Sequence, residues 1–291
     1  MSNSIEAEIL FRMPELDAPD APVLLEAFHY RFHPIWSIFM SHIHHKDVVH
    51  VDTFSMIPWW FVTKDHIHFN YNLAGGTMMG MGTYNFAALR LIFGAEPEEC
   101  LEANVKAFTE GVHHDCDYEF KTKFRFPGGG IGTAFSTLQG PTIWHPSYAT
   151  VTHRQVQVAD SSLPADQIKL VTREVTINGF IHAIFWHRVD ITETFEIQDK
   201  STGKTLKKWT EKQSKKAYTP RESGDAEIAK LDGEYYWMSF RYQLEQFVNR
   251  VKGRPTAYWV EREDSLNQMK MVDMAYEKSG LGVRPTSKFK A

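Results

Sequence analysis

A tyrosine that follows a run of glycines is the side chain of this sequence best placed for chemistry. The stretch LAGGTMMGMGTYNFAALRLIFG, residues 73–94, has the pattern of a helix that carries many glycines. Gly76, Gly80 and Tyr84 are spaced by four residues and therefore share one helical face. A glycine inside a helix costs about 1 kcal/mol relative to alanine. The presence of Gly80 one turn before Tyr84 therefore needs an explanation. The phenol of Tyr84 donates a hydrogen bond while it is neutral.

Histidines are the second group with possible chemistry, and the chain has 14 of them. His42 and His45 are three residues apart, which suits two metal ligands on one helix face. The sequence HHDCD, residues 113–117, also offers ligand atoms. Neither cluster is followed by a further ligand at the usual spacing, so a polar helix end and a loop are the favoured interpretations. His66 and His68 alternate as on a strand, which suggests a pocket wall. We expect no metal site.

Cofactor-binding motifs are absent from the sequence. The glycines at 128–130 and 132 lack the spacing of a dinucleotide-binding loop and lie between two strand patterns, so they predict a hairpin turn. No P-loop and no G-x-S-x-G elbow occurs. We therefore expect no bound cofactor.

Composition excludes several classes of protein. The 291 residues carry a formal charge of −4, which gives no reason to expect a nucleic-acid partner. The basic run at 204–216 is interpreted as a solvated hairpin or loop, in preference to a phosphate-binding arm. No apolar run is long enough to cross a membrane, and the start lacks a secretory signal. Cys100 and Cys116 do not make a disulfide framework, so we expect two reduced thiols in a cytoplasmic protein.

The elements around these residues predict an α+β fold. Helices are expected at residues 2–11, from Pro34 to Ile43, at 76–93 and in two C-terminal stretches, the second capped by Asp264 or Ser265 and ended by Gly280. Strands are expected at 23–28 and 47–57, and then in a series between Cys100 and about Trp209 that includes 181–187. The prediction is an open, mostly antiparallel sheet with helices packed on one face, in one domain that covers residues 1–291.

Three segments resemble one protein family. They are LLEAFHYRFHP (24–34), AGGTMMGMGTY (74–84) and the stretch from Tyr242 to Ser287. In this order they look like the C-terminal, substrate-binding domain of the glucose-fructose oxidoreductase / inositol dehydrogenase / dimeric dihydrodiol dehydrogenase superfamily, fungal type. The resemblance implies an open sheet with helices on one face that often pairs two subunits. We therefore expect a homodimer through the sheet face.

The sequence departs from that family at three points. The dinucleotide-binding Rossmann domain and the catalytic lysine of its Glu-Lys-Pro motif would precede Met1, so the chain is expected to lack them. Gly80 stands where the family has an aspartate, while Tyr84 keeps the acid/base position. Without the lysine, Tyr84 should stay a neutral phenol, a poor base but a good hydrogen-bond donor.

Three hypotheses follow for the function. The favoured one is a cofactor-independent enzyme, derived from a dehydrogenase, that catalyses a non-redox cyclisation, Diels-Alder-type cycloaddition or isomerisation of an apolar small molecule in secondary metabolism. The alternatives are a truncated NAD(P)-dependent oxidoreductase of the dihydrodiol or xylose dehydrogenase type, and a non-catalytic binding protein. Tyr84 is the predicted catalytic residue. The predicted substrate-binding residues are His29, Tyr30, Arg31, Phe69, Met78, Gly80, Met81, Trp144 and Trp186, for each of which core packing or an ion pair is the simpler explanation.

Overall fold

A computed structural model describes residues 1–63 and 65–287 of the chain. In this part of the chain one open sheet has the order β2-β3-β4-β1-β5-β7-β8-β9, and β6 pairs with β7. β1 and β4 run parallel, and every other pair is antiparallel. The strands are β1 (Val48–Pro58), β2 (Glu99–Ala107), β3 (Asp117–Arg125), β4 (Ile131–Gly140), β5 (Tyr148–His153), β6 (Val156–Val158), β7 (Gln167–Asn178), β8 (Arg188–Asp199) and β9 (Thr205–Lys215).

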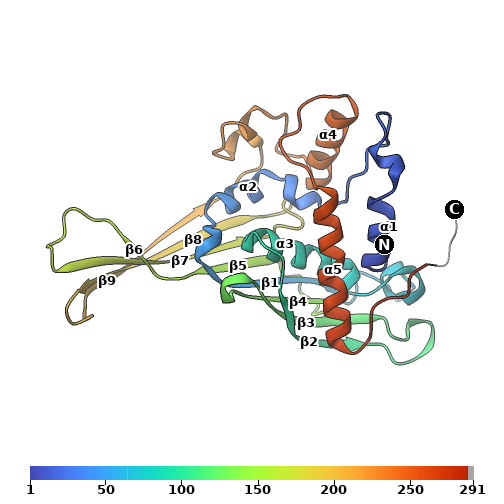
Figure 1. Ribbon diagram of the computed structural model, residues 1–291, viewed down its shortest axis with the longest axis horizontal. Helices are drawn as coiled ribbons and strands as arrows, with labels where there is room; N and C mark the ends of the chain where they lie inside the picture. Colours follow the sequence, from blue (N-terminus) through green and yellow to red (C-terminus); the bar gives the residue numbers. More distant parts are fainter. Residues whose placement is uncertain (64, 288–291) are drawn as a thin grey trace.

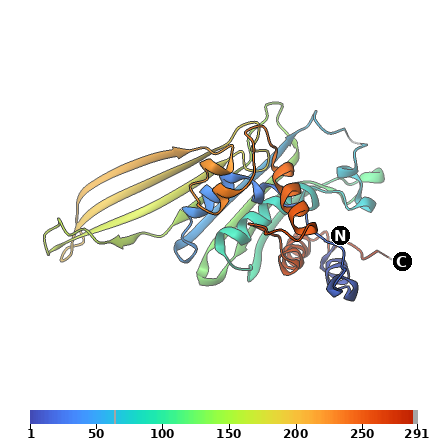
Figure 2. The same cartoon turned by 90° about the horizontal axis from the view of Figure 1, so that it is seen from above.

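The helices gather on one face of this sheet, which confirms the predicted α+β class (Figure 1). They are α1 (Ser4–Phe11), α2 (Pro34–Ser41), α3 (Thr83–Phe93), α4 (Ser239–Val251) and α5 (Arg262–Ser279). β7, β8 and β9 extend beyond the helices as a bare wing (Figure 2). The predicted basic hairpin is strand β9, at the edge of this wing, and most of its side chains are exposed.

The core lies between α3 and the inner face of the sheet. Phe86 of α3 packs 5.4 Å, centroid to centroid, from both Phe120 and Phe124 of β3. These three rings are fully buried. The alternation of aromatic residues in β3 predicted this face, because successive side chains on a strand point to opposite sides. α3 ends at Gly94, whose left-handed backbone (φ 61°) is accessible to glycine at little cost.

Four expectations about local structure are wrong. Residues 23–28 are extended but pair with no described strand, so they form none. Residues 181–187 lie in the turn that joins β7 to β8. The two strands pair with each other as far as Asn178 and Arg188, and the residues between these two form the connection. His66 and His68 lie at a 3₁₀ turn rather than on a strand. Helix α5 begins after Glu261, not at Asp264, which binds two arginines instead.

Within the part of the chain that the structure describes, every helix is too short or too polar to cross a membrane.

Candidate functional site

A single turn of π-helix, Met78–Gly82, carries the glycine-rich motif into α3. Asp117 at the start of β3 fixes the beginning of this turn. Its carboxylate accepts hydrogen bonds from the Met78 backbone N–H (2.7 Å) and the Tyr276 hydroxyl (2.8 Å), and Arg284 lies 3.3 Å away. Turns of π-helix occur often at functional sites, and this one brings Gly80 and Tyr84 to the same cavity.

Gly76, Gly80 and Gly82 of the motif stand in different structural environments. At Gly76 (φ 130°) a side chain would collide with the Asp117 carboxylate. At Gly82 a Cβ would lie 2.8 Å from the Phe120 ring. At Gly80 a Cβ would lie 3.5 Å from Nδ1 of His68, an ordinary contact. Packing therefore requires Gly76 and Gly82 but not Gly80, which lines open space.

That space is a cavity of about 440 Å³ beside Tyr84, here called the Tyr84 cavity. Its walls come from the segment 26–29, the π turn and α3, the β7–β8 turn, and the first turn of α4. The lining residues are Met1, Glu26, Ala27, Phe28, His29, Ile57, His68, Met79, Gly80, Met81, Thr83, Tyr84, Ile181, His182, Phe240 and Met269. No lysine or arginine side chain is among these described residues, so the cavity is apolar with a few polar groups.

Three polar groups in the Tyr84 cavity lack partners among the described residues. The Tyr84 hydroxyl forms no hydrogen bond. The buried Oε2 of Glu26 and Nε2 of His29 have none either. His29 is held by its other nitrogen, Nδ1, 2.7 Å from the Ser239 hydroxyl, and its ring stacks on Phe240 at 3.8 Å. Leaving a buried polar atom unpaired costs about 1–3 kcal/mol, so this arrangement favours a ligand.

The same three groups favour their uncharged forms. Burial lowers the pKa of His29 to about 3, and nearby His182 adds to the shift. Burial raises the pKa of Glu26, against the lowering effect of Ser265 and Arg31. Burial and the Glu26 carboxyl raise the pKa of Tyr84. The cavity thus presents neutral hydrogen-bonding groups within an apolar wall, which suits a neutral ligand rather than an anion.

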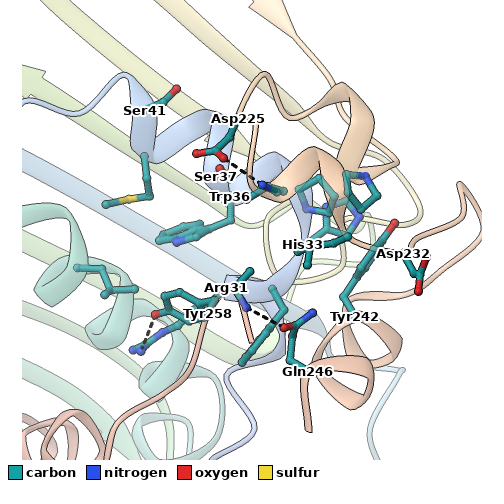
Figure 3. Close-up of a pocket in the computed structure, with 18 residues that line it drawn as sticks. Arg31, His33, Trp36, Ser37, Ser41, Asp225, Asp232, Tyr242, Gln246 and Tyr258 are labelled. Atoms are coloured by element: carbon teal, nitrogen blue, oxygen red, sulfur yellow. Dashed lines mark hydrogen bonds between the residues drawn. The ribbon is translucent and has the colours of Figure 1, made fainter. Parts of the chain in front are cut away.

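A second cavity, of about 400 Å³, borders the segment Arg31–Pro34 and is called here the Arg31 cavity (Figure 3). Several of its polar groups are engaged by the protein, although the buried Nε and Nη2 of Arg31 have no hydrogen-bond partner among the described residues. Arg31 pairs with Asp264 and lies 3.5 Å from the Tyr258 hydroxyl. Asp225 accepts from the Ile228 N–H (3.0 Å), and Gln246 accepts from the Ala257 N–H (3.1 Å). The bonds between lining residues, drawn as dashed lines in Figure 3, hold the walls together.

The structure places the predicted site residues in three groups. Tyr84, His29, Gly80 and Met81 line the Tyr84 cavity. Tyr30, Phe69 and Met78 are buried in the core and line neither cavity. Arg31 forms an ion pair with Asp264, in line with the simpler explanation given for it.

The two predicted tryptophans lie away from both cavities. Trp144 is 40% exposed in the β4–β5 connection. Trp186 lies in the β7–β8 turn, where the Arg188 guanidinium is 5.6 Å from its ring centroid.

Glu26, His182 and Phe240 line the cavity without having been predicted, whereas His68, which the sequence suggested for a pocket wall, does line it. Glu26 lies in the same motif as His29, so its position was a usable signal. His182 and Phe240 come from distant elements, and no local pattern marks them. Among the described residues, no group of three or more His, Cys, Asp or Glu side chains is arranged to hold a metal ion.

Comparisons with known proteins support the fold. No family model matches the sequence. No curated protein matches it either. Among solved structures, levoglucosan dehydrogenase in complex with NADH is similar over 96% of this chain and 69% of that chain (TM-score 0.63, 13% identity). An aldose-aldose oxidoreductase from Caulobacter crescentus, complexed with glycerol, is similar over 96% and 67% (TM-score 0.60, 14% identity).

A 3-ketoreductase from Actinomadura kijaniata, in complex with NADP, is also similar, over 96% of this chain and 68% of that chain (TM-score 0.59, 14% identity). These proteins are oxidoreductases of the glucose-fructose oxidoreductase / inositol dehydrogenase type. The chain has the fold of their C-terminal domain. It spans about two thirds of their length, and at this identity the likeness concerns the fold alone.

Proposed function

We propose that the Tyr84 cavity is the active site of a cofactor-independent enzyme that catalyses a non-redox cyclisation, cycloaddition or isomerisation of an apolar small molecule. The observation that carries this proposal is the unpaired, neutral Tyr84 hydroxyl in a cavity whose described lining has no lysine or arginine side chain. A phenol without a neighbouring cation is a weak base at neutral pH, but it donates a hydrogen bond to a carbonyl.

A cycloaddition would need little more than this cavity supplies. Three π bonds of the substrate become two σ bonds and one π bond, so no atom enters or leaves and no electron acceptor is needed. One donor placed in a dry site contributes about 3–4 kcal/mol. Holding diene and dienophile in a near-attack geometry contributes up to about 7–11 kcal/mol. Met79 and Met81 are flexible side chains that adapt to an irregular apolar ligand.

The test is turnover of linear polyenyl ketones and enones by the purified chain without NAD(P). Cyclised or isomerised product should form at a rate that does not change when NADP or NADPH is added. Tyr84→Phe should lose most of the rate, whereas Tyr235→Phe, which alters an exposed ring, should not. Turnover that appears only with NADP(H) would refute the proposal. If the wild type and Tyr84→Phe bind these compounds equally well and neither converts them, the chain is a binding protein.

The alternative function is an NAD(P)-dependent oxidoreductase, whose dinucleotide site would lie outside these residues. The fold favours it, because solved structures with this fold hold NADH or NADP. The genomic DNA upstream of Met1 decides between the two. An in-frame dinucleotide-binding domain there would support the oxidoreductase, and its absence would support the cofactor-independent enzyme.

We also propose that two copies pair through the open face of the sheet. On that face the Phe54 ring stacks on Phe135 and Tyr148, with centroids 5.7 and 5.1 Å away, and no described helix covers them. Sedimentation should show a dimer that Phe54→Lys dissociates; a wild-type monomer would refute the pairing. The cytoplasmic location stays a prediction from the free thiols Cys100 and Cys116.

A further inference from the structure

Glu26 is a buried carboxyl group that no hydrogen bond in the described structure fully explains. It lines the Tyr84 cavity, and its Oε2 is buried without a partner. The backbone around it is held firmly, because its carbonyl accepts from Gln243 Nε2 (2.7 Å) and from the Phe28 N–H (2.9 Å). The carboxyl group is therefore fixed at the cavity wall while one of its oxygens has no partner among the described residues.

We propose that Glu26 is a second hydrogen-bond donor, beside Tyr84, to the carbonyl oxygen of a neutral ketone or enone substrate. This inference rests on the proposed function and names the substrate class of the same site. A carbonyl oxygen has two lone pairs and accepts two donors at once. A neutral carboxylic acid has one O–H to donate, and an apolar site keeps it protonated so that it can do so.

Burial favours this protonated form, because it raises the pKa of Glu26, and Asp264 adds to the shift. The Ser265 side chain, Arg31 and the N-terminal amine oppose it, and the Arg31 guanidinium is also paired with Asp264. On the cavity side, burial lowers the pKa values of His29, His68 and His182, which favours neutral imidazoles. The N-terminal amine of Met1, which lines the cavity, is the cation that still opposes protonation of Glu26.

The two donors would act without proton transfer. As the carbon–carbon bonds form from substrate π electrons, negative charge grows on the carbonyl oxygen and both hydrogen bonds shorten. The protons stay on Tyr84 and Glu26, and no co-reactant is consumed. A carboxylate-bearing substrate would meet no lysine or arginine of the described lining and would lose its hydration, which excludes acids from the substrate class.

The first experiment needs no substrate. Infrared spectra of the full chain near neutral pH should contain a protonated-carboxyl C=O band that disappears in Glu26→Gln but remains in Glu211→Gln, which changes an exposed strand residue. Subtracting the Glu26→Gln spectrum from the wild-type spectrum removes the bands of other buried acids. If the Glu26 difference spectrum shows only ionised carboxylate, the proposal is overturned.

The second experiment uses β-ionone, an apolar enone, as the probe. Donation of hydrogen bonds to its carbonyl red-shifts its ultraviolet absorption. Glu26→Leu and Tyr84→Phe should each remove roughly half of the shift seen with the wild type. Glu26→Gln should keep most of it, because an amide N–H also donates. Equal shifts in wild type and Glu26→Leu, or no binding of β-ionone, would overturn the proposal.

These outcomes are separable from the fate of the proposed function. If the red shift depends on Glu26 but no polyenyl ketone is turned over, the pair of donors is supported and the proposed reaction is refuted. Turnover that depends on Tyr84 but is unchanged in Glu26→Leu keeps the reaction and refutes the second donor.

Discussion

The Tyr84 cavity and the Arg31 cavity border neighbouring residues of one short segment, His29–His33, and differ in how their polar atoms are paired. In the Arg31 cavity, Asp225 and Gln246 accept bonds from backbone N–H groups and Arg31 pairs with Asp264, although the buried Nε and Nη2 of Arg31 have no partner in the described structure. In the Tyr84 cavity, the hydroxyl of Tyr84 and one atom each of Glu26 and His29 have no partner in the described structure.

The difference indicates what each cavity is for. Hydrogen bonds between two protein groups stabilise the fold, and a ligand could bind to those groups only by breaking the bonds. Unpaired buried atoms destabilise the fold, since each has lost its water without replacement. Native structures contain few such atoms, and clusters of them need an explanation. The proposed ligand would give partners to Glu26 and His29, whereas the charge of Arg31 in the other cavity is already neutralised by Asp264.

The largest effect is expected from Tyr84→Phe. Removal of one donor should lower kcat about 100- to 1,000-fold, or about 3–4 kcal/mol in the barrier, while unfolding free energy changes by less than about 0.5 kcal/mol because no hydrogen bond is broken. The matched variant is Tyr258→Phe in the Arg31 cavity, whose hydroxyl accepts only a long 3.5 Å contact from Arg31. Rate assays and chemical denaturation measure both quantities. Equal losses of rate in the two variants would remove the distinction between the cavities.

Asp264→Asn should have the next largest effect, and on stability instead of rate. Asp264 pairs with Arg31 and with Arg90 (2.6 Å to Nη1), both buried. Loss of this charge leaves the buried Arg31 without a carboxylate partner, while Arg90 keeps its pair with Glu96, and it should cost about 3 kcal/mol, the lower end of the usual range because Asp264 is 21% exposed. The neighbouring Glu263→Gln, at an exposed pair with Arg12, should change less than about 0.5 kcal/mol.

The ion pairs of Asp264 also predict that the free energy of unfolding depends on pH. Burial works to raise the pKa of Asp264, but Arg31 and Arg90 lower it overall. Its contribution to stability is therefore present above the pKa of the unfolded chain, and it is lost as the pH falls through the lower, folded value. Acid titration of unfolding free energy should be shallower in Asp264→Asn than in the wild type. An identical slope would show that the pair contributes nothing.

Much of the fold was predictable from the sequence because its patterns are local. Alternation of aromatic residues marks the buried face of β3, and α1 lies within the helix expected at residues 2–11, where the Asn3 side chain caps it by accepting from the Glu6 N–H. Residues 23–28 show the limit. Their apolar sequence suits a strand, but a strand exists only if another one pairs with it. The sequence contains no sign of whether that neighbour is present.

The candidate site was predictable only in part, for a related reason. Spacing by four residues identified Gly80 and Tyr84 as neighbours, and both line one cavity. Met78 and Met81 were both predicted to bind substrate, but the π turn directs Met78 into the core and Met81 to the cavity. His182 reaches the same cavity from the β7–β8 turn, and its position depends on how the whole sheet is built.

Gly82→Ala tests packing on the core side of the glycine motif. A Cβ at this position would lie 2.8 Å from Cε1 and 3.0 Å from Cζ of Phe120, a ring in the centre of the core. The ring has little room to move, so overpacking should cost about 1–3 kcal/mol of unfolding free energy. Thermal or urea unfolding measures it. A variant as stable as the wild type would show that the core beneath the π turn adjusts freely.

Gly80→Ala should have the smallest effect on stability and is the sharpest test of the Tyr84 cavity. Its Cβ would meet His68 at 3.5 Å, an ordinary contact. Alanine favours a helix by up to about 1 kcal/mol over glycine, so unfolding free energy should stay equal or rise slightly. The added methyl group would enter the cavity wall one turn from Tyr84, so affinity for β-ionone should fall. If Gly80→Ala binds the probe as tightly as the wild type does, the space beside Gly80 is not where the ligand lies. Gly82→Ala is the matched control, because it adds the same methyl group on the core side of the same turn.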